Sequence, residues 1–96
     1  MIDKKINLSN YGEYSSDNYG SSRLIKLGSL ELYFSYQTII AIKDNKTNEF
    51  IISENKWNYT TGRHLNFISR DKSIRLNRKE FEKRAKEILK RYDLLN

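Results

Sequence analysis

Residues that could do chemistry are concentrated in one short segment, NYTTGRHLNFIS, at residues 58–69. The segment combines hydroxyls, a glycine, an arginine and His64, the chain's only histidine, and it continues directly into apolar residues. A threonine hydroxyl before an apolar run is typical of a helix N-cap, because it accepts a hydrogen bond from a backbone amide two or three residues further on. We therefore expect Thr60 or Thr61 to cap a short helix near residues 61–68.

The functional alternative for this segment is an anion-binding helix start. The amides that follow Thr61 and Gly62 would contact the anion, and Arg63 and His64 would be its charge partners. The chain lacks the extended glycine-rich loop and lysine that bind nucleotide phosphates, so the helix cap is the favoured interpretation.

Catalysis and metal binding find little support in the residue types. His64 has no second histidine to share a metal ion with, the chain contains no cysteine, and its carboxylates show no helical spacing with the imidazole. No nucleophile has a helper residue nearby in the sequence. We expect no catalytic residue, no metal and no cofactor, and we expect His64 to be a hydrogen-bonded structural or surface residue.

Length and composition limit the architecture. With 96 residues, of which 38 % are apolar and 31 % charged, the chain fits a single globular domain over residues 1–96 with a modest core. The absence of cysteine suits a reducing compartment, and the sequence shows neither a secretion signal nor an apolar run of about 18 residues. We expect a cytoplasmic protein that does not enter a membrane.

Strand signals follow a loop-rich N-terminal segment, residues 1–21. The strings RLIKL, LELYFSY, TIIAIK and EFIIS come in quick succession after it. In LELYFSY, apolar and polar side chains alternate, which predicts a strand with Leu30, Leu32, Phe34 and Tyr36 on one face. TIIAIK follows LELYFSY too soon for a crossover helix, so it either pairs antiparallel or continues the strand through a bend at Tyr36-Gln37. An antiparallel sheet of three to four strands is expected.

The C-terminal segment predicts an amphipathic helix from about residue 78 to residue 94. Asn77 is a good N-cap, and Glu80 stands three residues later, as in a capping box. The apolar side chains on one helical stripe are Phe81, Ala85, Ile88, Leu89, Tyr92 and Leu95. Packed against the sheet, this helix would complete an α+β fold.

Positive charge is concentrated towards the C-terminus. Residues 63–91 contain eleven Lys and Arg against four Asp and Glu, within a chain whose net charge is +6. They provide a basic face that would suit phosphate backbones or an acidic protein surface. The face comprises Arg70, Lys72, Arg75, Arg78, Lys79, Lys83, Lys86 and Lys90. Glutamates interleaved at helical spacings leave a solvated helix surface as the alternative interpretation.

Four residues are candidates for direct contact with a protein partner: Tyr36, Trp57, Arg63 and His64. Trp57 is the only tryptophan, and it either covers the edge of the core or anchors an interface. Tryptophan and tyrosine are enriched among the residues that contribute most binding energy at interfaces, so both aromatic residues are potential anchors.

Several strings in the chain resemble a family of small proteins of unassigned function from phages and other mobile elements. They are YGEYSSDNYG, LYFSYQT, WNYTTGRHLNFI and IRLNRKEFEKRAKEIL, which together run from about residue 11 to residue 89. The most specific are the motifs YFSY, residues 33–36, and TTGRHLN, residues 60–66. The resemblance supplies no activity. It implies a genetic setting in which small proteins often bind and disable or redirect a host protein.

Two function classes remain after these observations. The first is a non-enzymatic protein-binding module that occludes a surface of a host or defence-system protein, as an anti-CRISPR inhibitor encoded by a phage would. The second is a small basic nucleic-acid-binding accessory protein, although no base-reading motif accompanies the charge. DNA mimicry would require an acidic chain, and this chain is basic. We favour the first class, and pairing of exposed strand edges with a second copy stays open.

Overall fold

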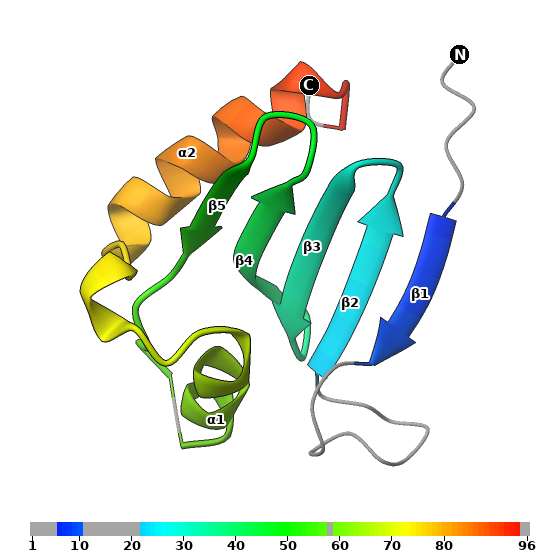
Figure 1. Ribbon diagram of the computed structural model, residues 1–96. Helices are drawn as coiled ribbons and strands as arrows, with labels where there is room; N and C mark the ends of the chain where they lie inside the picture. The colour runs from blue at the N-terminus through cyan, green and yellow to red at the C-terminus, as the bar shows by residue number, and fades with distance from the viewer. Residues whose placement is uncertain (1–5, 11–21, 58, 95–96) are drawn as a thin grey trace.

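The computed structural model describes residues 6–10, 22–57 and 59–94, and within them one antiparallel sheet is flanked by two α-helices (Figure 1). The strands lie in the sheet in chain order. They are β1 (Ile6–Asn10), β2 (Ser22–Leu27), β3 (Leu30–Ser35), β4 (Thr38–Asp44) and β5 (Glu49–Ile52). The helices are α1 (Tyr59–Ile68), a short 3-10 turn η1 (Lys72–Ile74) and α2 (Arg78–Arg91).

The α+β class, the antiparallel sheet and both helices are confirmed, and the sheet gains a strand that the sequence did not predict. Strand β1 lies inside residues 1–21, which we expected to be loop, and pairs with β2 from Ile6 opposite Leu27 to Asn10 opposite Arg23. The string INLSN has only two apolar residues, too few to show an alternating pattern. Its strand conformation depends on backbone pairing with β2, which is a tertiary contact.

A β-bulge in β4 determines which side chains face each helix. Tyr33 of β3 pairs with Ala41 whereas Phe34 pairs with Ile39, so Ile40 is an extra residue in β4. The bulge turns Ile40 and its neighbour Ala41 to the same side of the sheet. It explains why TIIAIK lacks the alternation that a regular half-buried strand would show.

The two helices cover opposite faces of the sheet, near its β4 and β5 side (Figure 1). On one face, α2 packs against the sheet through Phe81, Ala85 and Ile88. They form one cluster with the strand residues Leu30, Leu32, Ile42 and Ile51. On the other face, α1 packs against Ile40, Ala41 and Ile52 through Leu65. Strand β4 contributes to both clusters, so the core depends on its bulge.

Helix α2 begins as expected and ends earlier than expected. The Asn77 side chain accepts a hydrogen bond of 2.9 Å from the backbone amide of Glu80, which confirms the predicted N-cap. The helix ends at Arg91 instead of residue 94, because Tyr92 leaves the helical conformation and Asp93 has a φ of 59°.

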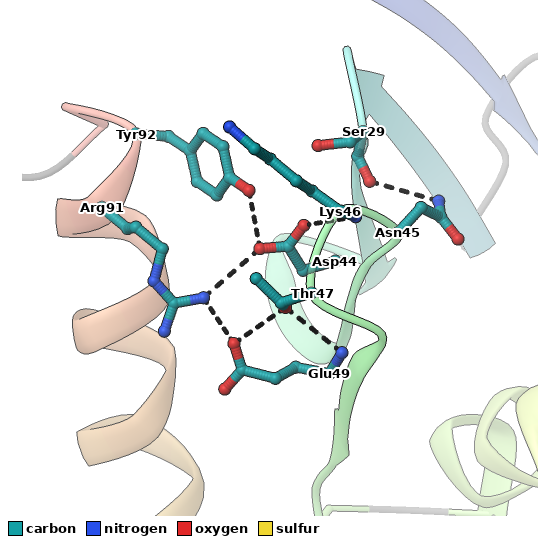
Figure 2. A network of polar contacts seen from close by, with 8 residues as sticks. All are labelled: Ser29, Asp44, Asn45, Lys46, Thr47, Glu49, Arg91 and Tyr92. Atoms are coloured by element: carbon teal, nitrogen blue, oxygen red, sulfur yellow. Dashed lines mark hydrogen bonds and ion pairs between the residues drawn. The ribbon is translucent and has the colours of Figure 1, made fainter.

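A buried carboxylate joins the C-terminal end of α2 to the turn between β4 and β5 (Figure 2). Asp44 is fully buried, and its Oδ2 accepts hydrogen bonds from the Tyr92 hydroxyl at 2.7 Å and from Arg91 Nη1 at 3.3 Å. Its Oδ1 accepts from the backbone amide of Lys46 at 3.0 Å. Arg91 also pairs with Glu49. The early end of α2 places Tyr92 where it can reach this carboxylate.

The hydrogen bonds keep Asp44 ionised despite its burial. Burial alone would raise the pKa of this carboxyl, but the Tyr92 hydroxyl and the backbone amides of Lys46 and Thr47 stabilise the anion and lower the pKa below its ordinary value. The carboxylate therefore stabilises the fold at pH values above about 3.8, the ordinary pKa of an aspartate carboxyl. This stabilisation is lost as the pH falls below that value.

We expect Asp44→Asn to lower the free energy of unfolding by about 1–3 kcal/mol at pH 7, because the amide cannot satisfy the donors that surround the carboxylate. Urea denaturation followed by circular dichroism measures this change. The difference from the unmodified chain should shrink as the pH falls below the ordinary pKa of Asp44. Glu87→Gln, at an exposed acid of α2, is the control and should change stability by less than about 0.5 kcal/mol. Equal stability of Asp44→Asn and the unmodified chain at pH 7 would contradict the role of the network.

Candidate functional site

Helix α1 begins before the threonines that we expected to cap it. Its first residue is Tyr59, so Thr60 and Thr61 lie within the first turn instead of preceding it. The capping prediction is therefore wrong. The Thr61 hydroxyl lies 2.9 Å from Ser35 Oγ of β3, and this long-range partner gives the side chain its role in the fold.

A buried cluster of two hydroxyls and one imidazole, which we call the hydroxyl–imidazole cluster, joins β3 to α1. It consists of Ser35, Thr61 and His64, whose exposed fractions are 3 %, 3 % and 0 %. Ser35 Oγ lies 2.8 Å from His64 Nδ1 and also bonds Thr61. The cluster brings the YFSY and TTGRHLN motifs into direct contact. Sequence reasoning missed Ser35, because the alternation in LELYFSY placed it on the polar face of its strand.

His64 is not part of the molecular surface. We expected it to contact a partner together with Tyr36, Trp57 and Arg63, but its side chain is enclosed between β3 and α1. The Tyr36 ring covers it, with ring centroids 6.2 Å apart and planes tilted by 52°. Tyr36, Trp57 and Arg63 are exposed.

Burial determines the protonation state of His64. Removal of the ring from water disfavours the imidazolium, and the nearby Arg63 guanidinium disfavours it further, so the pKa of His64 is lowered from its ordinary value of 6.5. At neutral pH the ring is therefore uncharged and can share its hydrogen bond with Ser35.

An open groove of about 850 Å³ lies between α2, the start of β4 and the Trp57 loop. The groove has apolar lining from Ile39, Phe81 and Leu89. The full lining is Gln37, Thr38, Ile39, Lys56, Trp57, Arg78, Phe81, Glu82, Ala85, Lys86 and Leu89. Trp57 forms one wall with 42 % of its surface exposed. We call this feature the Trp57 groove.

The Trp57 groove adjoins the hydroxyl–imidazole cluster. A small pocket of about 90 Å³ is lined by Ser35, Thr61 and Tyr36, and it shares Thr38 and Trp57 with the groove. The YFSY and TTGRHLN motifs therefore meet beside the Trp57 groove.

Hydrogen bonds and a close contact with α1 hold the loop that carries Trp57. The backbone amide of Glu54 donates to the Leu76 carbonyl at 2.7 Å, and the amide of Trp57 donates to Asn55 Oδ1 at 3.0 Å. Gly62 of α1 lies against Asn55 so closely that a Cβ atom at this position would be 2.9 Å from Asn55 Nδ2. The glycine of the TTGRH segment thus allows α1 to approach the loop.

Two arginines of the predicted basic face are committed to the fold. Arg78 Nη1 donates to the Ile39 carbonyl at 2.9 Å, and its guanidinium lies over the Trp57 ring, with its carbon 5.1 Å from the ring centroid. Arg75 Nη2 donates to Asn66 Oδ1 at 2.9 Å and to the Ser69 carbonyl at 3.2 Å. Both side chains are half-buried, so neither extends freely into solvent as a phosphate-binding face requires.

The other basic residues are exposed. They are Arg70, Lys72, Lys79, Lys83, Lys86 and Lys90. The four of them that belong to α2 follow one another at helical spacing, on the side away from its buried residues Phe81, Ala85 and Ile88. They are Lys79, Lys83, Lys86 and Lys90. We call these four residues the lysine stripe.

Among the residues that the structure describes, neither a metal-binding group nor a membrane-spanning helix is found. No group of three or more His, Asp or Glu side chains among them is arranged to hold a metal ion. None of the helices within the described ranges is long and apolar enough to cross a membrane.

Comparison with known protein families matches residues 6–83 to the Family of unknown function (DUF8033). The chain belongs to this family. The DUF8033 match covers the whole sheet and α1, and it ends within α2 at Lys83, before Lys86 and Leu89 of the groove. No curated protein and no solved structure was found to be similar. Membership in DUF8033 thus identifies the family without assigning an activity.

We expect the stability of this DUF8033 chain to fall as the pH drops from about 6.5, because the unfolded chain binds a proton at His64 more readily than the folded chain does. Urea denaturation at pH values from about 7 to about 5 measures the loss. As the only histidine, His64 also gives an unambiguous NMR titration of its ring protons. In His64→Asn, which is expected to be less stable at neutral pH, stability should no longer change over this range. A folded-state pKa at or above 6.5 would refute the burial argument.

Proposed function

We propose that this chain is a non-enzymatic protein-binding module that holds a segment of a partner protein in the Trp57 groove. The observation that carries the proposal is the groove itself, an open hollow of about 850 Å³ with an exposed tryptophan at its wall. Protein partners are commonly anchored by a few aromatic and apolar contacts of this kind, surrounded by polar residues. Here the surrounding residues are charged, with Lys56 and Lys86 among them.

Rigidity of the groove supports this function. Arg78 stacks between the rings of Trp57 and Phe81, at 5.1 Å and 4.8 Å from their centroids, and bonds to the Ile39 carbonyl. The tryptophan therefore loses little conformational freedom when a partner binds, which lowers the entropic cost of association.

Burial of the hydroxyl–imidazole cluster supports a function without catalysis. Ser35 and His64 lie within hydrogen-bond distance, as a nucleophile and its base would, but their side chains are enclosed between β3 and α1. The Ser35 hydroxyl is also engaged by Thr61. With at most 3 % of each residue exposed, and only a pocket of about 90 Å³ beside them, the cluster fits a structural role.

The more specific form of the proposal is that the partner is a host or defence-system protein and that the chain inhibits it by occluding its surface. The resemblance of YFSY and TTGRHLN to proteins of phages and mobile elements supports this choice of partner. The mode of inhibition follows from the groove, since a module without chemistry acts by covering the surface it binds.

We expect a photo-crosslinking residue in place of Gln37, on the groove, to capture the partner, while the same residue in place of Lys79, outside the groove, does not.

Trp57→Ala should weaken partner binding by at least about 30-fold, the effect of losing an interface anchor. Its folding stability should change by only about 1 kcal/mol, because the ring is partly exposed. Phe67→Ala, at an exposed aromatic residue away from the groove, is the control. Equal capture at both positions, or unchanged binding by Trp57→Ala, would reject the proposal.

A second candidate function, nucleic-acid binding, is favoured by the lysine stripe. Its four side chains are exposed on one face of α2 and could follow a phosphate backbone. Against it, Glu80, Glu82 and Glu87 lie on the same helix, and Arg75 and Arg78 are occupied elsewhere. We therefore rank it below protein binding.

Fluorescence anisotropy with labelled duplex DNA, single-stranded DNA and RNA separates the two candidates. If the lysine stripe binds phosphates, the affinity for duplex should fall with a log–log salt slope of about 0.9 per contact, and each Lys→Ala change in the stripe should reduce the slope by about one. If protein binding is the function, affinity for all three probes at physiological salt should stay near the non-specific range of about 10⁻⁴ to 10⁻⁶ M. Submicromolar binding at this salt concentration would favour nucleic acid.

A further inference from the structure

We infer that the Trp57 groove recognises an acidic segment of its partner, and that Arg78 binds one of the segment's side-chain carboxylates. The inference rests on the proposed function and specifies the chemistry of the partner. It follows from three features of the groove: the position of Arg78, the charges at the rim, and the contact between Arg78 and Glu82.

Arg78 is a cation held in place within an apolar groove. Its guanidinium is fixed between Trp57 and Phe81, its Nη1 donates to the Ile39 carbonyl, and its side chain is 17 % exposed. Within the described residues, the guanidinium's hydrogen bonds are made by Nε and Nη1, so Nη2 can still donate to a ligand. A guanidinium with a fixed orientation and free donors suits a carboxylate, which forms short charge-assisted hydrogen bonds with it.

The rim of the groove adds further positive charge. Lys56 on the Trp57 loop and Lys86 on α2 line the groove together with Arg78, and Glu82 is the one acidic residue among the lining residues. Cations on separate elements suit several carboxylates spread along a segment, whereas a single chain terminus would supply only one. We therefore assign the ligand as an internal acidic segment with apolar side chains. The apolar side chains would cover Ile39 and Leu89.

Glu82 engages Arg78 Nε, which a partner's carboxylate bound side-on would use together with Nη2. Its Oε2 accepts from Arg78 Nε at 3.0 Å, four residues away on the same helix, and the glutamate side chain is 57 % exposed. Because the glutamate is exposed to water, the pair is weak and a partner's carboxylate can replace it. Glu82 also repels an acidic ligand. Removing its charge should therefore strengthen binding, an effect that partial unfolding of the variant would not produce.

The probes are three synthetic peptides of about twelve residues. Leucine alternates with glutamate in the first and with glutamine in the second, and both are acetylated and amidated. The third contains glutamate and has a free C-terminal carboxylate. Binding to the full chain is followed by the NMR signal of the indole N–H, which is unambiguous because Trp57 is the only tryptophan.

We expect the amidated glutamate peptide to shift the indole signal saturably and to bind at least about ten-fold tighter than the glutamine peptide, because it alone provides charge-assisted hydrogen bonds. Glu82→Gln should tighten binding of the glutamate peptide about three-fold or more and leave the glutamine peptide unchanged. Lys56→Gln and Lys86→Gln should each weaken it, whereas Lys79→Gln, on α2 but outside the groove lining, is the matched control and should have a smaller effect.

The possible results separate this inference from the proposed function. Equal affinity for the glutamate and glutamine peptides would overturn the acidic-segment inference, while partner capture at Gln37 would still support the groove as a docking site. Tight binding that requires the free C-terminal carboxylate would also overturn it and identify a chain terminus as the ligand. Weaker binding of the glutamate peptide by Glu82→Gln would overturn the role assigned to Arg78.

Discussion

The bulge at Ile40 is the constraint on which the rest of the structure depends. In a regular strand, Ile40 and Ile42 would face the same side, and one helix would lose part of its apolar support. With an extra residue in β4, Ile40 and Ala41 face α1 while Ile39 and Ile42 face α2. The bulge thereby moves Ile40 to the α1 face, where it packs with Ala41, Ile52 and Leu65.

The bulge also places the polar groups of the site. Beyond it, β3 and β4 continue to pair up to Ser35 opposite Thr38, so Ser35 lies beneath α1 within reach of Thr61 and His64. On the opposite face, the carbonyl of Ile39 accepts from Arg78. The hydroxyl–imidazole cluster and the wall of the Trp57 groove are thus positioned by adjacent segments of the same strand pair.

Two buried polar networks hold the elements that surround the groove. Asp44 ties the end of α2 to the β4–β5 turn through Tyr92 and Arg91, and the hydroxyl–imidazole cluster ties α1 to β3. Buried polar groups lose their contacts with water and are stable only when partners replace that water. These networks therefore favour one arrangement of the helices. A fixed arrangement is what a docking groove needs, since a mobile groove would have to be ordered each time a partner binds.

Local pattern was sufficient to predict the α+β class, the four strands from β2 to β5 and the start of α2. Alternation in LELYFSY and the 3.6-residue apolar stripe after Asn77 are short-range signals, because neighbouring residues alone determine them. The strand β1, the bulge at Ile40 and the start of α1 at Tyr59 were not predicted, because each depends on the segment that packs or pairs with it.

The sequence by itself determined four of the strands, the presence of both helices and the basic character of the chain. It also indicated the residues TTGRH and Trp57 as candidates for function. Only the tertiary structure decided their roles. In the structure, His64 and Ser35 are buried, and Thr61 contacts a hydroxyl instead of capping a helix. Arg78 lines a groove beside Trp57 instead of extending from the basic face. The physical reason is that burial and hydrogen-bond partners are supplied by residues far apart in the chain. Ser35 and His64 are 29 positions apart, and Arg78 and Ile39 are 39 apart, so no local pattern records their contact.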